Sequence, residues 1–270
     1  MPHLTSLSLS ARSSGSGFPF SVPIIRSLRR LDLDSPVTFF VGENGSGKST
    51  LLEGLAIAAG VPVVGSESAE RDATLGAQRE LAKALKLTWK KRTHRGFFLR
   101  AEDFFGFAKS LSKMRAELRT RLEEVDVEYR DRSDHARTLA KGPARASLAE
   151  MESRYGEDLD ANSHGQSFLK LFASRFVPGG LYILDEPEAP LSPQSQLGLM
   201  AMLHDMIGQD GQFVIATHSP ILLAFPGARI YDFDRVPPAA VKYEELEHVA
   251  LTREFLAAPE RFLSKLLRDG

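Results

Sequence analysis

Short apolar runs alternate with longer amphipathic stretches along the chain, and this alternation predicts an α/β fold. A short apolar run bounded by turn residues is typical of a strand that is buried on both faces of a parallel sheet. A longer apolar stretch over residues 51–59 is typical of a buried helix. The runs that predict buried strands are residues 38–41, 96–99, 181–184, 212–217 and 228–234.

Other periodicities predict the parts that surround this sheet. Residues 3–34 alternate short apolar and polar stretches, which predicts antiparallel strands ahead of the first buried strand. Helical spacing predicts a helix over residues 78–87 and a long amphipathic helix over residues 102–129. The apolar residues of this region keep no heptad, and Gly142-Pro143 is expected to interrupt it, so a long coiled coil is not expected.

Two later helices have recognisable first residues. Ser163 is a suitable N-cap for a helix with an apolar face at Phe168, Leu171, Phe172 and Phe176. Ser192-Pro193 combines a hydroxyl cap with a proline at the first helical position. The apolar face of that second helix is expected to contain Leu199, Leu203, Met206 and Ile207.

One loop between a predicted strand and a predicted helix carries most of the chemical information. Residues 42–50 fit the pattern G-x-x-x-x-G-K-S/T, in which glycines let successive N–H groups point at phosphate oxygens. Lys48 can reach the β and γ phosphates, and the Ser49 hydroxyl can hold Mg²⁺. The expected nucleotide-binding residues are Asn44, Gly45, Ser46, Gly47, Lys48, Ser49 and Thr50.

Three more candidates follow the ends of two buried strands. Asp185 and Glu186 come directly after residues 181–184, and His218 comes directly after residues 212–217. Open α/β sheets bind ligands at the carboxyl ends of their strands. We therefore expect Asp185 to hold Mg²⁺ through water, Glu186 to polarise an attacking water and His218 to contact a γ-phosphate oxygen.

Composition restricts the classes of function without selecting one. The 34 Lys and Arg residues nearly balance the 35 Asp and Glu residues, so no whole-molecule field favours nucleic acid or a membrane. Between Lys86 and Arg145, however, there are 16 basic residues and 9 acidic ones. This local excess fits a nucleic-acid backbone, or equally a solvated helix face with pairs such as Lys113 with Glu117 and Glu117 with Arg121.

Cysteine, signal and membrane features are also absent from the sequence. The chain has no cysteine, which excludes disulfides and thiolate metal sites. No apolar run is long enough to span a bilayer, and the first residues do not have the pattern of a signal peptide. A cytoplasmic protein without direct membrane insertion is expected.

Together these motifs resemble the nucleotide-binding domain of ABC-type ATPases, especially the RecF-like and structural-maintenance-of-chromosomes branch and its small standalone bacterial members. Residues 42–50 match the Walker A loop, residues 181–186 match Walker B with its catalytic glutamate, and His218 matches the switch histidine. Residues 163–166 resemble the signature sequence with histidine replacing its first glycine, and residues 189–192 fall at the D-loop. The resemblance implies Mg-ATP hydrolysis in a head-to-tail homodimer, where Ser163, Gly165 and Gln166 face the ATP of the other subunit.

The chain departs from the family pattern at two positions. Ser192 stands where the D-loop usually has aspartate. The Q-loop glutamine is not evident, and Glu102 is a candidate to replace it as a Mg²⁺ or water ligand, although an acid at a helix start has an equally good structural explanation. Phe18 or Phe20 is a candidate for stacking on adenine, with an ordinary core role as the alternative.

The predicted organisation is one ABC-type P-loop NTPase domain over residues 1–270, with a mixed sheet, N-terminal antiparallel strands and an inserted helical subdomain. Its parts are residues 1–64 with the Walker A loop, a mainly helical insertion at 77–160, a core with signature, Walker B and switch histidine at 161–235, and a helical tail at 236–270. His248 in that tail is expected to be solvated.

The functional alternatives are the ATPase subunit of a membrane transporter and a nucleic-acid module switched by nucleotide. A small-molecule kinase is disfavoured because the signature serine and switch histidine would have no role in it.

Overall fold

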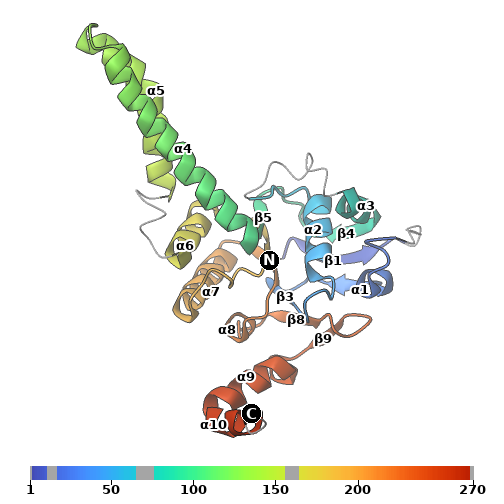
Figure 1. Cartoon of the computed structure of the whole chain (residues 1–270). Helices are drawn as coiled ribbons and strands as arrows, with labels where there is room; N and C mark the ends of the chain where they lie inside the picture. The colour runs from blue at the N-terminus through green and yellow to red at the C-terminus, as the bar shows by residue number, and fades with distance from the viewer. Residues whose placement is uncertain (1, 11–16, 65–75, 156–163, 268–270) are drawn as a thin grey trace.

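The computed structural model describes residues 2–10, 17–64, 76–155 and 164–267, which form a sheet core, a projecting helical arm and a C-terminal pair of helices (Figure 1). Among the described residues, the main sheet has six strands in the order β5-β6-β7-β3-β8-β9. All of its neighbours run parallel except β9, which is antiparallel to β8. The strands are β3 (Val37–Val41), β5 (Gly96–Arg100), β6 (Leu181–Asp185), β7 (Gln212–Ala216), β8 (Arg229–Asp232) and β9 (Ala239–Val241).

Alternate residues of the central strands pack into two hydrophobic clusters, one on each face of the sheet. On one face, Phe39, Tyr182 and Phe213 lie in the cluster that includes helices α6 (His164–Arg175), α7 (Pro193–Gly208) and α8 (Pro220–Leu223). On the other face, Phe40, Ile183 and Val214 lie in the cluster that includes α2 (Lys48–Ala59). Both faces are therefore covered, which explains why β3, β6 and β7 are uniformly buried.

A second, antiparallel sheet lies beside α2 and has the order β2-β1-β4 within the described residues. Its strands are β1 (Leu4–Leu9), β2 (Leu31–Asp32) and β4 (Leu85–Trp89), with α1 (Pro23–Ser27) between β1 and β2. The antiparallel strands predicted ahead of the phosphate loop are thus confirmed. The helix predicted over residues 78–87 ends too late, because α3 (Gly76–Ala84) stops where β4 begins to pair with β1.

A buried glutamine joins the two sheets. Gln212 is fully buried at the first position of β7, and its side-chain oxygen accepts hydrogen bonds from the backbone N–H groups of His3 and Leu4. Its side-chain nitrogen donates to the carbonyl oxygens of Leu4 and Leu33. Because a buried amide with no partner would cost about 1–3 kcal/mol, these four bonds favour one placement of β1 beside the parallel sheet.

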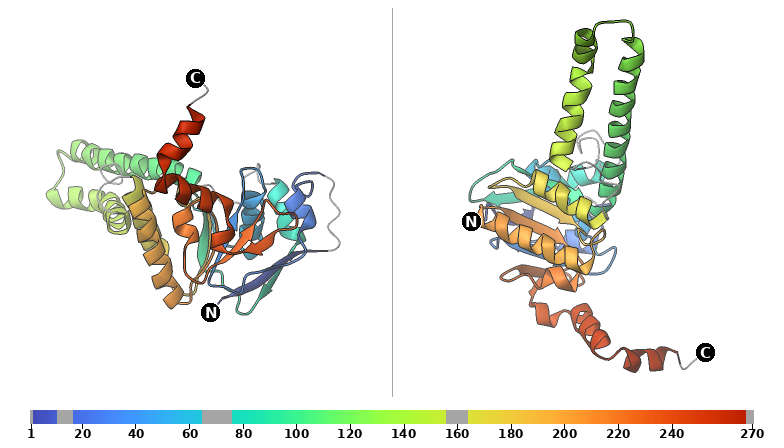
Figure 2. Two further views of the ribbon diagram at one scale, coloured as in Figure 1. Left: turned by 90° about the horizontal axis from the view of Figure 1, so that it is seen from below. Right: turned by 90° about the vertical axis from the view of Figure 1, so that its left-hand side faces the viewer.

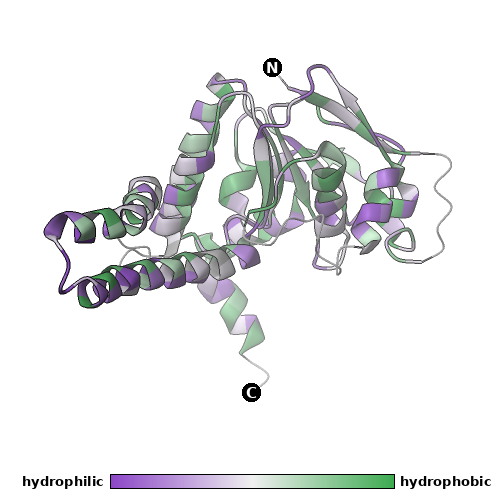
Figure 3. Cartoon of the chain, turned by 90° about the horizontal axis from the view of Figure 1, so that it is seen from above, coloured by the Kyte–Doolittle hydropathy of each residue, from purple (hydrophilic) through white to green (hydrophobic). Residues whose placement is uncertain are grey.

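The projecting arm is an antiparallel pair of helices, α4 (Ala101–Glu128) and α5 (Asp134–Tyr155) (Figure 2). Val125 and Ala144 are buried in the arm, and Leu111 and Met151 join the core cluster near its base. Hydrophilic residues recur along both helices (Figure 3). In the described part of the chain, no helix combines the length and the apolar character needed to cross a membrane.

Two expectations about this arm are resolved by the structure. The pair of Lys113 with Glu117 forms at 3.8 Å, whereas Arg121 pairs with Glu124 and Glu128. The expected interruption at Gly142-Pro143 is wrong, because α5 continues through Pro143. A proline inside a helix costs about 3 kcal/mol, and packing of α5 along α4 offsets that cost. The arm is therefore a two-helix hairpin.

The C-terminal segment crosses from the sheet to two exposed helices. After β9, which the sequence pattern did not predict, come a short 3₁₀ helix (Tyr243–Glu245), α9 (Glu247–Ala257) and α10 (Pro259–Leu266). Leu246 and Val249 are buried against the core, and the Tyr243 hydroxyl donates a hydrogen bond to the Pro220 carbonyl. Helices α9 and α10 lie within the predicted tail, and the segment before them is attached to the residues that follow β7.

Candidate nucleotide site

The phosphate loop connects β3 to α2, as its sequence predicts. Gly42, Gly45 and Gly47 have positive φ angles of 151°, 84° and 98°, which L-residues with side chains rarely adopt. At Gly47 an added Cβ atom would also lie 2.9 Å from the Val22 side chain. The backbone conformation of the loop therefore depends on glycine, and Gly47 is the tightest of these three positions.

Lys48 lies over the loop that it follows. Its side chain is buried, and its Nζ donates to the carbonyl oxygens of Gly42 at 2.6 Å and Glu43 at 2.9 Å. Burial lowers the pKa of Lys48, while the nearby carboxylates of Glu186 and Asp185 oppose that shift. The ammonium group is thus positioned beside the residues expected to contact phosphate.

Asp185 and Ser49 come together at the carboxyl end of β6. Asp185 is buried, and burial raises its pKa to about 6, while a hydrogen bond with the Ser49 side chain acts in the opposite direction. Its Oδ1 atom is buried and has no hydrogen-bond partner among the described residues. A carboxylate oxygen and a hydroxyl side by side fit Mg²⁺, which prefers oxygen ligands.

A metal here would not be enclosed by protein side chains alone. Within the described residues, no group of three His, Cys, Asp or Glu side chains is arranged to hold a metal ion. Mg²⁺ often takes only one or two protein ligands and completes its shell with water and phosphate oxygens. Ser49 and Asp185 therefore fit a nucleotide-bound Mg²⁺.

Glu186 and His218 face each other across the ends of two neighbouring strands. His218 Nε2 lies 3.7 Å from Glu186 Oε1, and both side chains are partly exposed. Glu186 has a φ of 51°, and its backbone N–H donates to the Ala216 carbonyl at 2.9 Å. This left-handed conformation is uncommon for a residue with a side chain and is a form of strain that clusters at functional sites.

Glu188 is a polar neighbour of this pair that the sequence reasoning missed. Its Oε1 accepts a hydrogen bond from the His218 backbone N–H at 2.7 Å. The residue is three positions after β6, in the loop that also contains Glu186. A third acid in the sequence Asp185-Glu186-Pro187-Glu188 was the available signal.

A pocket of about 400 Å³ opens beside Asp185 and contains the Q-loop candidate. Glu102 lines it, with a side chain that is 76% exposed and a weak contact to Arg100 at 3.5 Å. Arg100 and Glu53, which the sequence reasoning also missed, form a tighter ion pair at 2.8 Å in the same pocket. Glu102 thus lies near the Asp185 edge with a mostly exposed side chain.

The described signature residues Gly165 and Gln166 are on α6, which lies on the other side of the sheet from α2. Helix α6 packs in the cluster opposite the one that contains α2. Gly165 is buried, and a Cβ atom there would meet Ser195 Oγ at 3.2 Å and the Pro190 carbonyl oxygen at 3.3 Å. Gln166 is exposed, and Ser163 lies outside the described residues. The chain therefore does not bring Gly165 and Gln166 to its own phosphate loop.

The D-loop candidate Ser192 has a local structural role. Its hydroxyl accepts a hydrogen bond from the Ser195 backbone N–H at 3.2 Å and donates to Ser195 Oγ at 3.0 Å. Ser192 is the N-cap of α7 and Pro193 is its first residue, as the sequence predicts. The hydroxyl that replaces the usual aspartate is thus used to begin the helix.

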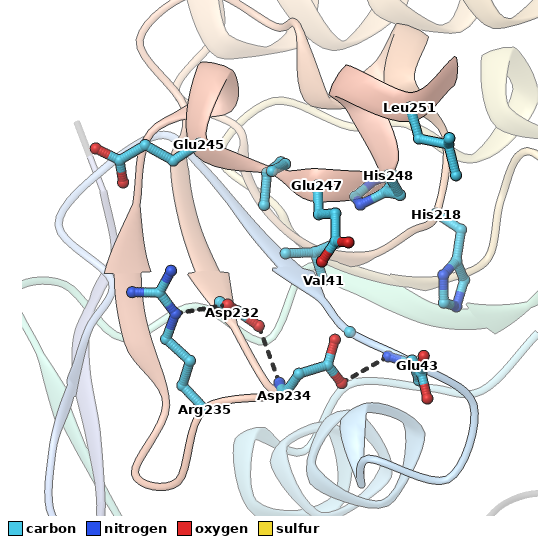
Figure 4. A pocket seen from close by; sticks show the side chains of 12 residues that line it. Val41, Glu43, His218, Asp232, Asp234, Arg235, Glu245, Glu247, His248 and Leu251 are labelled. Carbon is cyan, nitrogen blue, oxygen red and sulfur yellow. Dashed lines mark hydrogen bonds and ion pairs between the residues drawn. The ribbon is translucent and has the colours of Figure 1, made fainter. Parts of the chain in front are cut away.

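A larger pocket of about 550 Å³ lies between the phosphate loop and α9 (Figure 4). His218 and His248 both line it, and burial together with the His218 charge lowers the pKa of His248. In the same pocket, the Glu43 backbone N–H donates to Asp234 Oδ1 at 2.8 Å. The expectation that His248 is solvated is wrong, because β9 and the following turn return α9 to the sheet edge.

A third pocket, of about 560 Å³, lies on the outer side of the phosphate loop. Its walls combine loop residues such as Asn44 with apolar residues such as Ile24 and Phe233. Neither aromatic candidate for adenine stacking is among the described residues that line it. Phe18 is 56% exposed, and Phe20 packs against the cluster that contains α2.

One protein-family model matches part of the chain. Residues 37–162 match the model of a family described as "AAA domain, putative AbiEii toxin, Type IV TA system". The match covers β3, the phosphate loop and the arm, and it ends before β6. The predicted mixed sheet, with a phosphate loop between one of its strands and a helix, is confirmed by the structure itself.

Some solved structures are similar to the chain at low sequence identity, among them one chromosome-maintenance head domain and transporter cassettes. An Smc head domain from Pyrococcus furiosus, with an extended coiled coil and bound to the C-terminal domain of ScpA, is 14% identical with a TM-score of 0.47, covering 94% of this chain and 100% of that one. A nucleotide-free ATP-binding cassette of an ABC transporter is 13% identical with a TM-score of 0.42, covering 96% and 97%. Another cassette, in its ADP conformation, is 14% identical with a TM-score of 0.44, covering 86% and 87%. A search of curated proteins found no match.

Proposed function

We propose that this protein binds Mg-ATP and hydrolyses it. The observation that carries the proposal is the buried, unpartnered Oδ1 of Asp185 beside the Ser49 hydroxyl, within the described part of a site that also contains Lys48 and Glu186. A buried carboxylate oxygen without a partner is costly, and a bound cation would stabilise it. Since the adjacent loop is built for phosphates, the fitting cation is the Mg²⁺ of a nucleoside triphosphate.

Each residue of the proposed site has a role that follows from its position. The N–H groups of residues 44–50 and the ammonium of Lys48 bind the phosphates. Ser49 and Asp185 hold Mg²⁺, which would supply charge neutralisation for the phosphates. Glu186 accepts a proton from the attacking water, and His218 donates to the γ-phosphate. Glu102 is proposed as a more distant contributor through water, consistent with its exposure.

We further propose that the site is completed by a second copy of the chain. Within one chain, Gly165 and Gln166 lie on the opposite side of the sheet from α2. A head-to-tail arrangement would present Ser163, Gly165 and Gln166 of one protomer to the ATP of its partner. The ATP would then bridge two protomers, and hydrolysis would separate them.

The substitution Glu186→Gln tests both parts of this proposal. We expect it to lower kcat at least about 100-fold, because a general base contributes about 10²–10⁴-fold. With saturating Mg-ATP, it should accumulate as a dimer in light scattering. The control is Lys48→Ala combined with Glu186→Gln, which should remain monomeric because it lacks the phosphate contact. Absence of ATP hydrolysis by the unsubstituted protein would refute the enzyme assignment, and a monomeric Glu186→Gln variant would refute the dimer.

Hydrolysis is proposed to change the conformation of a partner protein or to act on nucleic acid. The segment before the arm favours nucleic acid as a second candidate function, because residues 86–100 contain six basic residues and no acidic one, whereas helices α4 and α5 of the arm together contain 9 basic and 10 acidic residues. DNA or RNA binding should then weaken steeply with salt. Absence of binding to either nucleic acid at low salt would remove this candidate.

The transporter alternative is less favoured because Glu102 is exposed where a Q-loop glutamine is expected, and co-purification with a membrane protein would restore it.

A further inference from the structure

The loops that follow β6 and β7 are connected by one carboxylate. Asp185 and Ala216 are paired in register at the ends of these strands, so Glu188 and His218 begin from neighbouring positions. Adjacent strands are about 4.8 Å apart, a gap that a glutamate side chain can cross. Glu188 crosses it, and its Oε1 accepts from the His218 backbone N–H at 2.7 Å.

The environment of Glu188 makes this contact costly to lose. Burial raises the pKa of Glu188, while hydrogen bonds from the His218 backbone and the Thr217 side chain lower it. Its other oxygen, Oε2, is buried and has no partner among the described residues. The side chain is therefore held mainly by Thr217 and His218, the two residues that follow β7.

A second set of hydrogen bonds fixes the residue on the far side of His218. The Ser219 hydroxyl donates to Gln196 Oε1 at 2.5 Å, and Gln196 Nε2 donates to the Leu191 carbonyl at 3.3 Å. The Ser219 backbone N–H donates to Thr217 Oγ1 at 3.0 Å. Hydrogen bonds thus hold the residues on both sides of His218, because the Thr217 backbone N–H also donates to the Phe40 carbonyl at 3.1 Å.

We propose that Glu188 is a positioning residue that sets the place of the His218 imidazole beside Glu186. With its backbone fixed at 217–219, the imidazole has only its own side-chain torsions left to adjust, and its Nε2 lies 3.7 Å from Glu186 Oε1. Glu188 acts through His218 and needs no contact with the nucleotide. This inference rests on the proposed hydrolysis of ATP, for which it names an additional determinant of rate.

Two conservative substitutions separate the effect of the side-chain length of Glu188 from the effect of its charge. Glu188→Gln keeps the length and an acceptor oxygen, and we expect kcat within about 3-fold of the unsubstituted protein. Glu188→Asp keeps the charge but is one methylene shorter, and we expect kcat to fall about 10–100-fold while KM for ATP changes less than about 3-fold. The exposed Glu244→Asp is the matched control and should change neither constant. A Glu188→Asp variant as active as the unsubstituted protein, or a greater loss for Glu188→Gln than for Glu188→Asp, would overturn the proposal.

A double-mutant cycle tests whether the effect passes through the imidazole. In a His218→Ala background, Glu188→Asp should lower kcat less than about 2-fold, because no imidazole remains to be positioned. Losses that multiply would show that Glu188 acts independently and would refute the inference.

Amide hydrogen exchange supplies a readout that does not depend on hydrolysis. Glu188→Asp should speed exchange at the His218 amide at least about 10-fold, whereas Glu188→Gln should not. Unchanged exchange in Glu188→Asp would refute the inference whether or not ATP is hydrolysed. An inactive unsubstituted protein with the expected exchange pattern would instead refute only the proposed function.

Discussion

The Arg100 guanidinium lies 2.8 Å from the Glu53 carboxylate, and both side chains are largely buried. Glu53 is one helical turn after Ser49 on α2, while Arg100 is the last residue of β5 and directly precedes the arm helix α4. The ion pair therefore joins the phosphate-loop helix to the base of the arm. Burial raises the pKa of Glu53, and the Arg100 charge acts against that shift.

Removing one partner of this pair should be strongly destabilising. Arg100→Ala would leave the Glu53 carboxylate buried without its cation, which typically costs about 3 kcal/mol or more. The matched control is Arg30→Ala, which breaks an exposed pair with Asp32 of similar length, 2.7 Å, and should cost less than about 1 kcal/mol. Urea unfolding measures both values. Equal losses in the two variants would mean that burial of the Glu53 pair has no energetic consequence.

The buried carboxyl of Asp185 should make stability depend on pH. Its folded pKa of about 6 is above its ordinary value of 3.8, so the folded state holds this proton more tightly than the unfolded state. The associated stability is present below about pH 4 and is lost as the pH rises through about 6, by roughly 3 kcal/mol at most. Asp185→Asn lacks this dependence and should gain stability relative to the unsubstituted protein between about pH 4 and about pH 8. A constant difference across that range would contradict the raised pKa.

The same proton should compete with Mg²⁺. Since Mg²⁺ binds the ionised carboxylate, metal affinity in the presence of ATP should fall as the pH decreases below about 6. Titration calorimetry at about pH 5 and about pH 8 measures the change. Equal affinities at the two pH values would argue against Asp185 as a ligand.

Two glycines of the phosphate loop separate the cost of a positive φ angle from the cost of a steric clash. Gly45→Ala introduces a side chain at a φ of 84° where no described atom lies within 4 Å, so we expect a cost of about 1–2 kcal/mol. Gly47→Ala adds a Cβ 2.9 Å from Val22 at a φ of 98° and should cost at least about 1 kcal/mol more. Denaturant unfolding of the nucleotide-free protein measures both. A Gly45→Ala variant that is the less stable of the two would contradict the clash at Val22.

The two C-terminal helices should differ in their importance for stability. Helix α10 has no buried residue among those described, and its aromatic contact is between Phe262 and Phe255 of α9. Truncation after Ala258 should therefore cost less than about 2 kcal/mol. Truncation after Glu245 also removes the buried Leu246 and Val249, and should cost about 3 kcal/mol or more. Equal unfolding free energies for the two truncations would show that Leu246 and Val249 do not anchor the tail.

Local sequence patterns predicted the parts of the site that each strand or loop carries by itself. Residues 42–50 specify their loop through glycine spacing, and Asp185, Glu186 and His218 follow apolar runs that are recognisable as buried strands. Glu188 and Arg100 were missed because their significance depends on partners on other elements, His218 and Glu53. Such contacts require the strand order, which a single strand does not encode.

The predictions about the fold that were wrong have related causes. Residues 85–89 are compatible with a helix or a strand until β1 is known to lie beside them, a pairing of distant segments. Pro143 was expected to interrupt a helix because a proline inside a helix is destabilising. The packing of α5 along α4, which offsets this cost, is not visible in the local sequence. His248 was assigned to solvent from its acidic neighbours in sequence, although the chain folds it back to the pocket that contains His218.

The arm begins beside the candidate nucleotide site and extends away from it. Helix α4 has 28 residues and so extends about 42 Å from the residue that follows Arg100. A tilt of roughly 10° at the base of the arm would move the far end by about 7 Å, while the base itself shifts by far less. A small displacement at the Glu53 and Arg100 pair is difficult to resolve locally. The same tilt moves the tip of the arm much further, so a distance probe at the tip would detect it.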